Sequence, residues 1–218
     1  AVSITLTAQT EGFSITGGAS GDTLTGGSGN DSFMGFAGAD TVTGGGGTDT
    51  IILSATSADL NSATDNQLVT VEAVSASGAA GAVSITLTAQ TEGFSITGGA
   101  SGDTLTGGSG NDSFMGFTGA DTVTGGGGVD TIVLTATSAT LNTAIDAQLV
   151  TVEAVSAAGA AGAVSITLTA QTEGFSITGG ASADTLTGGS GDDSFLGFAG
   201  ADTVTGGGGT DTIILTAT

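Results

Sequence analysis

The chain has 218 residues, 42 of them Gly, and a formal net charge of −21 because it carries 21 acidic side chains and no Lys, Arg or His. It also lacks Cys, Pro, Trp and Tyr. The absence of His, Cys and Lys excludes imidazole, thiolate and amine catalysis and leaves zinc without its usual nitrogen and sulfur ligands. With no basic side chain and only short apolar runs, we expect a protein that is not an enzyme, binds no nucleic acid and does not insert into membranes.

An 81-residue repeat organises the chain. The opening sequence AVSITLTAQTEGFSITGGAS at Ala1 returns almost unchanged at Ala82 and again at Ala163. The spacing predicts modules at residues 1–81 and 82–162 and a truncated third module at 163–218.

Each module contains four consecutive nonapeptides. In the first module they read GGASGDTLT, GGSGNDSFM, GFAGADTVT and GGGGTDTII, with Asp always sixth and an apolar residue always eighth. A tripeptide such as Thr23–Thr25 favours a short strand with Leu24 inward, and the Gly-rich residues before it favour a tight turn. Two nonapeptides would then form one coil of a β-solenoid. These blocks span residues 17–52, 98–133 and 179–214.

The spacing of nine between apolar residues continues outside the glycine loops, through Leu6 and Ile15 before the block and Leu60 and Val69 after it. If this register persists, a module makes four and a half coils and successive blocks face opposite ways. The spacers, residues 54–81 and 135–162, either continue the solenoid irregularly or cap one block against the next. In the first spacer we expect a short helical turn over residues 64–67 and a strand over 69–74.

The outward side chains define two faces. Residues 5–7, 23–25 and 41–43 would stack into rows of Thr, which either bind a flat ligand such as ice or simply suit a solvated strand. On the other sheet we expect Met34 and Ile52 to be exposed, together with Phe36 in a loop. Such apolar residues favour lateral packing against another chain or coverage by the module's own spacer.

The Asp residues need a counter-charge. Stacked coils bring carboxylates 18 residues apart to roughly 4.8 Å, and two unit charges at about 4 Å repel by about 4 kcal/mol at an effective dielectric near 20. Calcium removes this repulsion, because it takes six to eight oxygens from carboxylates and backbone carbonyls. The alternative is that the Asp side chains only support turns.

The nonapeptides resemble the RTX, or hemolysin-type, calcium-binding repeat GGxGxDxUx. GGSGNDSFM and GGGGTDTII match this pattern fully, whereas Ser20 and Phe36 stand at positions where the family has Gly. The resemblance implies an all-β, right-handed parallel β-roll with calcium between equivalent loops one coil apart. The flanking AQTEGFSITGG resembles sequences between RTX blocks of secreted bacterial S-layer proteins and very large adhesins.

The resemblance also implies two calcium ions per block, each held by two Asp carboxylates and by loop carbonyls. At Ser20 the side chain would make a positive φ less favourable, and Glu11 would add an incomplete site at the edge of the block. The first block would use Asp22 and Asp40 with the carbonyls of Gly18, Ser20, Gly35 and Ala37, and Asp31 and Asp49 with those of Gly27, Gly29, Gly44 and Gly46. The second would use Asp103 and Asp121 with Gly99, Ser101, Gly116 and Thr118, and Asp112 and Asp130 with Gly108, Gly110, Gly125 and Gly127. The third would use Asp184 and Asp202 with Gly180, Ser182, Gly197 and Ala199, and Asp193 and Asp211 with Gly189, Gly191, Gly206 and Gly208.

From this resemblance we expect an extracellular, cell-surface protein that folds on binding calcium after type I secretion and self-associates side by side or end to end into a surface layer, fibre or adhesin stalk. Two other functions stay open. One is an ice- or polysaccharide-binding module that uses the Thr rows. The other is the secretion and folding segment of an RTX enzyme or toxin.

Overall fold

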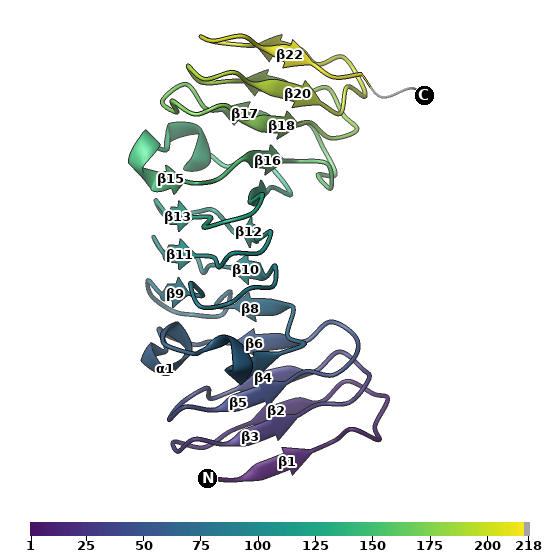
Figure 1. Cartoon of the computed structure of the whole chain (residues 1–218). Coiled ribbons are helices and arrows are strands. Elements are labelled where there is room, and N and C mark those ends of the chain that lie inside the picture. Colours follow the sequence, from purple (N-terminus) through teal and green to yellow (C-terminus); the bar gives the residue numbers. More distant parts are fainter. Residues whose placement is uncertain (216–218) are drawn as a thin grey trace.

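The computed structural model describes residues 1–215, so the last three residues of the predicted third module lie outside the described part. The fold is a parallel β-solenoid in which very short strands stack coil upon coil, with the first strand, β1, and the last strand, β22, at opposite ends of the stack (Figure 1). All strand pairs are parallel and in register. The predicted all-β solenoid is therefore confirmed.

One sheet runs without a break along the whole solenoid. It contains eleven strands, every second strand of the chain. They are β2 (Ser14–Thr16), β4 (Ser32–Met34), β6 (Thr50–Ile52), β8 (Ala73–Ser75), β10 (Ser95–Thr97), β12 (Ser113–Met115), β14 (Thr131–Val133), β16 (Ala154–Ser156), β18 (Ser176–Thr178), β20 (Ser194–Leu196) and β22 (Thr212–Ile213).

The opposite face is divided into three shorter sheets, one per module. The first contains β1 (Ser3–Thr5), β3 (Thr23–Thr25), β5 (Thr41–Thr43) and β7 (Leu68–Val69). The second contains β9 (Ser84–Thr86), β11 (Thr104–Thr106), β13 (Thr122–Thr124) and β15 (Leu149–Val150). The third contains β17 (Ser165–Thr167), β19 (Thr185–Thr187) and β21 (Thr203–Thr205).

Short helices interrupt this divided face at the spacers. They are α1 (Ala58–Asn61) and the 3₁₀ helices η1 (Asp65–Gln67), η2 (Leu141–Thr143) and η3 (Asp146–Gln148). The side chain of Ser57 caps α1 by accepting the Leu60 N–H at 3.1 Å. No helix among residues 1–215 is long and apolar enough to cross a membrane.

The core is the column of eighth-position side chains between the two faces. Leu24, Phe33, Val42 and Ile51 are all buried, and Phe33 lies opposite Ile51 in the parallel register. Alternation along each three-residue strand points only its central side chain inward, as the sequence predicts. Each coil thus adds one residue from each face to a narrow stack.

Each module makes four coils, and the predicted four and a half is wrong. Along the continuous sheet Ile15, Phe33, Ile51, Val74 and Ile96 are successive neighbours in register. The first two coils have 18 residues, but those through the spacer have 23 and 22. Successive blocks consequently face the same way, because the extra residues form α1, η1 and the turn after β8 instead of another half-coil.

The nine-residue register also shifts at the edges of the block. Ile4, and not Leu6, lies opposite Leu24, so the expected stack of residues 5–7 on the Thr rows is wrong. In the spacer Leu60 is buried as expected, but Leu68 takes the core position predicted for Val69, which is 40% exposed. The Thr rows run through only three coils before the spacer interrupts them.

The spacer contains the predicted helical turn as η1, but its strand is split. The strand expected over residues 69–74 becomes β7 and β8, separated by residues 70–72, of which Thr70 has a φ of +49°. Both strands join the sheets of the preceding block. The spacer therefore continues the solenoid and at the same time interrupts one of its faces.

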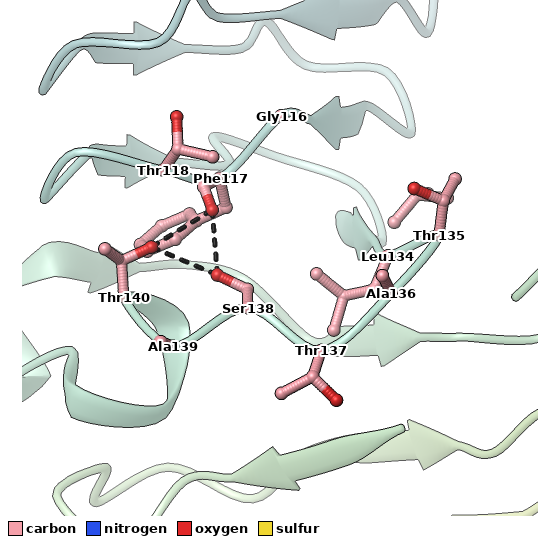
Figure 2. A pocket seen from close by; sticks show the side chains of 11 residues that line it. Gly116, Phe117, Thr118, Leu134, Thr135, Ala136, Thr137, Ser138, Ala139 and Thr140 are labelled. Carbon is pink, nitrogen blue, oxygen red and sulfur yellow. Dashed lines mark hydrogen bonds between the residues drawn. The ribbon is translucent and has the colours of Figure 1, made fainter. Parts of the chain in front are cut away.

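Phe36 is buried, contrary to its expected exposure. It is 6% exposed, and Ser57 at the start of α1 donates a hydrogen bond from Oγ to the Phe36 carbonyl at 2.9 Å. Figure 2 shows the equivalent arrangement in the second module, where the hydroxyls of Ser138 and Thr140 both reach the carbonyl of Phe117. The module's own spacer covers this residue. Ile52 is 38% exposed, as predicted, whereas Met34, expected to be exposed as well, is half-buried.

Side chains complete the junction between modules on the divided face. The side-chain amide of Asn61 pairs with the backbone of β9. Its Nδ2 donates to the Ser84 carbonyl at 3.0 Å and its Oδ1 accepts the Thr86 N–H at 2.9 Å, as the backbone of a neighbouring strand would. The buried Gln90 donates from Nε2 to the carbonyl of Ala63 at 3.0 Å. These contacts place the next module in register where strand pairing stops.

Candidate metal centre

The sixth-position Asp residues form a ladder along each edge of the solenoid. Asp31 accepts the Gly27 N–H of its own loop at Oδ2 (2.8 Å) and the Phe13 N–H of the preceding coil at Oδ1 (2.7 Å). Its own N–H donates to Asp49 Oδ1 at 2.7 Å. Both Asp side chains are buried. The Asp31 carboxylate therefore closes its own turn and ties it to the coil before, and Asp49 Oδ1 ties its loop to that of Asp31.

The same contact recurs between the other predicted pairs. In every case the N–H of the earlier Asp donates to Oδ1 of the Asp one coil later, at 2.7–3.0 Å. The pairs are Asp22 with Asp40, Asp103 with Asp121, Asp112 with Asp130, Asp184 with Asp202 and Asp193 with Asp211. The Asp side chains thus do support turns, and they also lie in register between adjacent coils.

Oxygens converge on spaces that only glycine leaves open. The point where a Cβ of Gly17 would lie is 3.2 Å from Asp22 Oδ2, 3.3 Å from Asp40 Oδ2 and 3.5 Å from the carbonyl oxygen of Gly35. On the opposite edge the corresponding point of Gly26 contacts Asp31 Oδ2 and the carbonyl oxygen of Gly44. Such all-oxygen surroundings suit a hard cation such as calcium.

The same convergence repeats in the later blocks. Asp112 Oδ2 and the Gly125 carbonyl meet at Gly107, and Asp193 Oδ2 and the Gly206 carbonyl meet at Gly188. Among residues 1–215 no three acidic side chains gather at one place. A cation at these positions would therefore need the backbone carbonyls as well as the carboxylates.

Several of the predicted carbonyl donors have other contacts. The backbone N–H groups of Gly18, Ala37 and Thr118 donate hydrogen bonds to Oδ2 of the Asp in the same loop. The carbonyl of Gly27 accepts the Gly46 N–H at 2.9 Å, and Gly29 packs on the backbone of Glu11. The equivalent carbonyls of Gly108 and Gly189 accept N–H groups from Gly127 and Gly208. Of the predicted carbonyl donors in the first block, those of Gly35 and Gly44 meet the carboxylate oxygens at Gly17 and Gly26.

Ser20 adopts no left-handed conformation, so the expected cost at this position is absent. Within the described residues, non-glycine positions with positive φ are Ala39, Thr70, Ala120 and Thr151. Glu11, expected to add an incomplete site, is exposed, and its Oε2 accepts the neighbouring Thr10 N–H at 3.4 Å.

Burial shifts the acid–base properties of the ladder. It raises the pKa of Asp121 and of Asp130 to about 6, and it also raises the pKa of Asp49, Asp112 and Asp193. At Asp22 the pKa is lowered instead, by N–H donors from Gly18 and Val2. The carboxylates with a raised pKa thus lack a nearby positive charge that would favour their ionised form. A bound cation would provide that charge.

A comparison with protein families identifies these loops. The model of the RTX calcium-binding nonapeptide repeat matches residues 16–51, 97–132 and 178–213, about half of the chain. This protein is an RTX calcium-binding nonapeptide repeat protein. The matched segments coincide, within one residue, with the three predicted blocks, and the stacked Asp loops are those of an RTX β-roll. Comparisons with curated proteins and with solved structures find no significant match.

The sequence prediction missed an acidic residue of the RTX ladder in each spacer. Glu72 Oε2 accepts the Asp49 N–H at 2.8 Å, and Glu153 Oε2 accepts the Asp130 N–H at the same distance. Each Glu accepts the N–H of the last Asp of its block, as the Asp one coil later does for the other Asp residues. It follows the preceding Asp by 23 residues instead of 18, so the nonapeptide spacing does not find it.

Proposed function

We propose that this RTX protein is an extracellular structural protein whose modules form a calcium-rigidified rod within a bacterial surface layer, fibre or adhesin stalk. The observation that carries the proposal is the unbroken eleven-stranded sheet (Figure 1). At the module borders β8 pairs with β10 and β16 pairs with β18, each through three residues in register. Modules joined in this way transmit bending and tension through a backbone ladder instead of a flexible linker.

Calcium would supply the rigidity of the rod. In the first block Asp22 and Asp40 with the carbonyl of Gly35 would hold one ion, and Asp31 and Asp49 with the carbonyl of Gly44 would hold the other. When bound, the ion supplies the positive charge that buried carboxylates in adjacent coils lack. Because each set of donors spans two coils, binding would stabilise the stack itself.

The surface of the rod favours a structural role over an enzymatic one. Two grooves, of about 380 and 330 Å³, lie between a spacer and the loop that it covers. The larger is lined by aliphatic side chains, glycine, Phe117 and the hydroxyls of Ser and Thr (Figure 2). Such a lining offers no side chain that exchanges protons near neutral pH.

The outer face of the continuous sheet is suited to lateral association with another copy of the chain. In a protein with a net charge of −21, the strands of this face present no acidic side chain outward. One of its rows repeats apolar pairs, Met34 beside Ile52 and Met115 beside Val133, between pairs of Ser and Thr. Two copies could pack these faces together without bringing their charges into contact.

A calcium titration tests the proposal. Protein freed of calcium is titrated while far-UV circular dichroism records β-structure and negative-stain electron microscopy records particle shape. We expect a disordered acidic chain without calcium and straight rods or sheets with it. A far-UV spectrum and particle shape that do not change with calcium would contradict the proposal. Magnesium at the same concentration is the control for ionic strength.

A further inference from the structure

In the last loop of a block, the Asp carboxylate lacks a hydrogen bond that it has in the loop one coil earlier. In residues 26–31 the Gly27 N–H donates to Asp31 Oδ2. At the same position of the last loop, the Gly45 N–H donates instead to the hydroxyl of Thr70 in the spacer, at 2.8 Å. As a result Asp49, which is 0% exposed, has a buried Oδ2 with no hydrogen-bond partner among the described residues. A buried, unpaired carboxylate oxygen is costly.

Two oxygens from the spacer lie close to this Asp. The space left open by Gly44 is bounded by Asp49 Oδ2 and by the carbonyl oxygen of Thr70. Glu72 Oε2 accepts the backbone N–H of Asp49 at 2.8 Å, so a second carboxylate reaches the same residue. Thr70 reaches this position with a φ of +49°, a left-handed conformation that is strained for a β-branched residue. The strain is consistent with a carbonyl held in place for a ligand.

The second module repeats every part of this arrangement. The Gly126 N–H donates to the Thr151 hydroxyl at 2.9 Å, and Asp130 Oδ2 is buried without a partner. Asp130 Oδ2 and the Thr151 carbonyl meet at Gly125, and Glu153 Oε2 accepts the Asp130 N–H. Thr151 has a φ of +48°. Each of the two spacers therefore brings the same two oxygen donors to the last Asp of its block.

We propose that Asp49, Glu72 and the carbonyl of Thr70 form an additional calcium site that closes the block against its spacer, and that Asp130, Glu153 and Thr151 form its counterpart. These cap sites lie partly outside the matched segments, which end at residues 51 and 132, so they are distinct from the sites within the nonapeptides. Two carboxylates and one carbonyl supply three donors, and water completes the coordination, as calcium allows. The inference rests on the proposed calcium-bound form of the blocks.

A cap site makes the spacer part of the calcium-dependent fold. Because Thr70 and Glu72 lie between β7 and β8, binding there would fix the point at which the chain crosses from one face to the other. Calcium would then set the register of the next module as well as the rigidity of the block.

The double variant Glu72→Gln, Glu153→Gln tests the cap sites. Calcium bound per chain is measured by equilibrium dialysis and atomic emission at saturating calcium. We expect the variant to bind two ions fewer than the wild type, one for each altered site. The matched control is Glu92→Gln, Glu173→Gln, which removes the same charge from exposed positions and should leave the count unchanged. An unchanged count in the first variant, with circular dichroism showing it folded, would overturn the inference.

A second measurement uses the wild-type chain and so does not depend on how the variant folds. Crystals grown with calcium are examined by long-wavelength anomalous diffraction. Peaks beside Asp49 Oδ2 and Asp130 Oδ2, next to the Thr70 and Thr151 carbonyls, would support the cap sites. Peaks confined to the nonapeptide sites would overturn this inference alone. Absence of calcium from the blocks as well would overturn the proposed function with it.

Discussion

In the nonapeptides that begin at Gly17 and Gly26, the first glycine is required for space more than for backbone freedom. In the loops at residues 17–22 and 26–31 no glycine has a positive φ, whereas Gly45 and Gly47 in the last loop do. What distinguishes Gly26 is that a Cβ there would overlap Asp31 Oδ2 and the Gly44 carbonyl. The residue keeps open the volume in which the oxygens of two coils meet.

Replacing this glycine should weaken calcium binding at one site. In Gly26→Ala the new methyl group occupies the oxygen-lined space, and overpacking of this kind typically costs about 1–3 kcal/mol. We expect the calcium midpoint of folding, followed by circular dichroism, to rise about tenfold, which corresponds to about 1.4 kcal/mol. Gly78→Ala is the control, because nothing lies within 4 Å of a Cβ at that position. Equal midpoints for the two variants would contradict this role.

At the scale of elements, the spacer joins modules by different means on the two faces. On the continuous face it contributes β8, which pairs with β6 before it and β10 after it. On the divided face strand pairing stops, and polar side chains of Asn61 and Gln90 take its place. Long side chains at fixed positions therefore substitute for a missing strand.

The junction glutamine offers a test of this substitution. Gln90→Leu removes the donor to the Ala63 carbonyl and leaves that carbonyl unpaired in a buried position, which should lower the free energy of unfolding by about 1–3 kcal/mol. Gln9 occupies the same place in the first module, where it is exposed, so Gln9→Leu should have little effect. Urea unfolding at saturating calcium measures both. A similar loss in the two variants would show that Gln90 does not hold the junction.

For the whole molecule, the balance of charge sets the response to pH. Without a cation the pKa of Asp121 and of Asp130 is raised to about 6, so the folded state binds more protons than the unfolded state between about pH 4 and 6. Its stability is then present at low pH and lost as the pH rises through 6. The lowered pKa of Asp22 acts in the opposite direction, but at a single residue.

Calcium should reverse this dependence. Binding requires ionised carboxylates, so the calcium-loaded protein is expected to gain stability over the range in which the calcium-free protein loses it. Far-UV circular dichroism at pH 5 and pH 7 gives the folded fraction in calcium-free buffer, and urea unfolding midpoints at the same two pH values give the stability at saturating calcium. If the folded fraction and the midpoint change in the same direction with pH, the ladder does not bind the cation through its carboxylates.

Much of the coil was predictable because its determinants are local. The alternation in Thr23–Thr25 predicts which side chain faces inward, and the glycines before each Asp predict the turn. The repeat of the Asp every nine residues predicts an acidic ladder on each edge, since a coil of two nonapeptides returns the chain to the same edge. The family match and the parallel register agree with these predictions.

The spacer was less predictable because its register depends on contacts between coils. Whether Leu68 or Val69 faces the core depends on which of them lies opposite Val42, and the burial of Phe36 depends on where α1 crosses it. The spacing of apolar residues nine apart does not predict how many residues a helix adds between two strands. The same insertion hides Glu72 from the nonapeptide spacing.

The sequence by itself therefore determined the repeating coil, its inward residues and the two acidic edges, because each of these follows from residues within one nonapeptide and the next. Only the tertiary structure decided that a module makes four coils, that all blocks face the same way, and that the spacer brings Thr70 and Glu72 to the last Asp of the block. The physical reason is that hydrogen bonds and packing between coils, and not local preference, decide how many residues each coil holds.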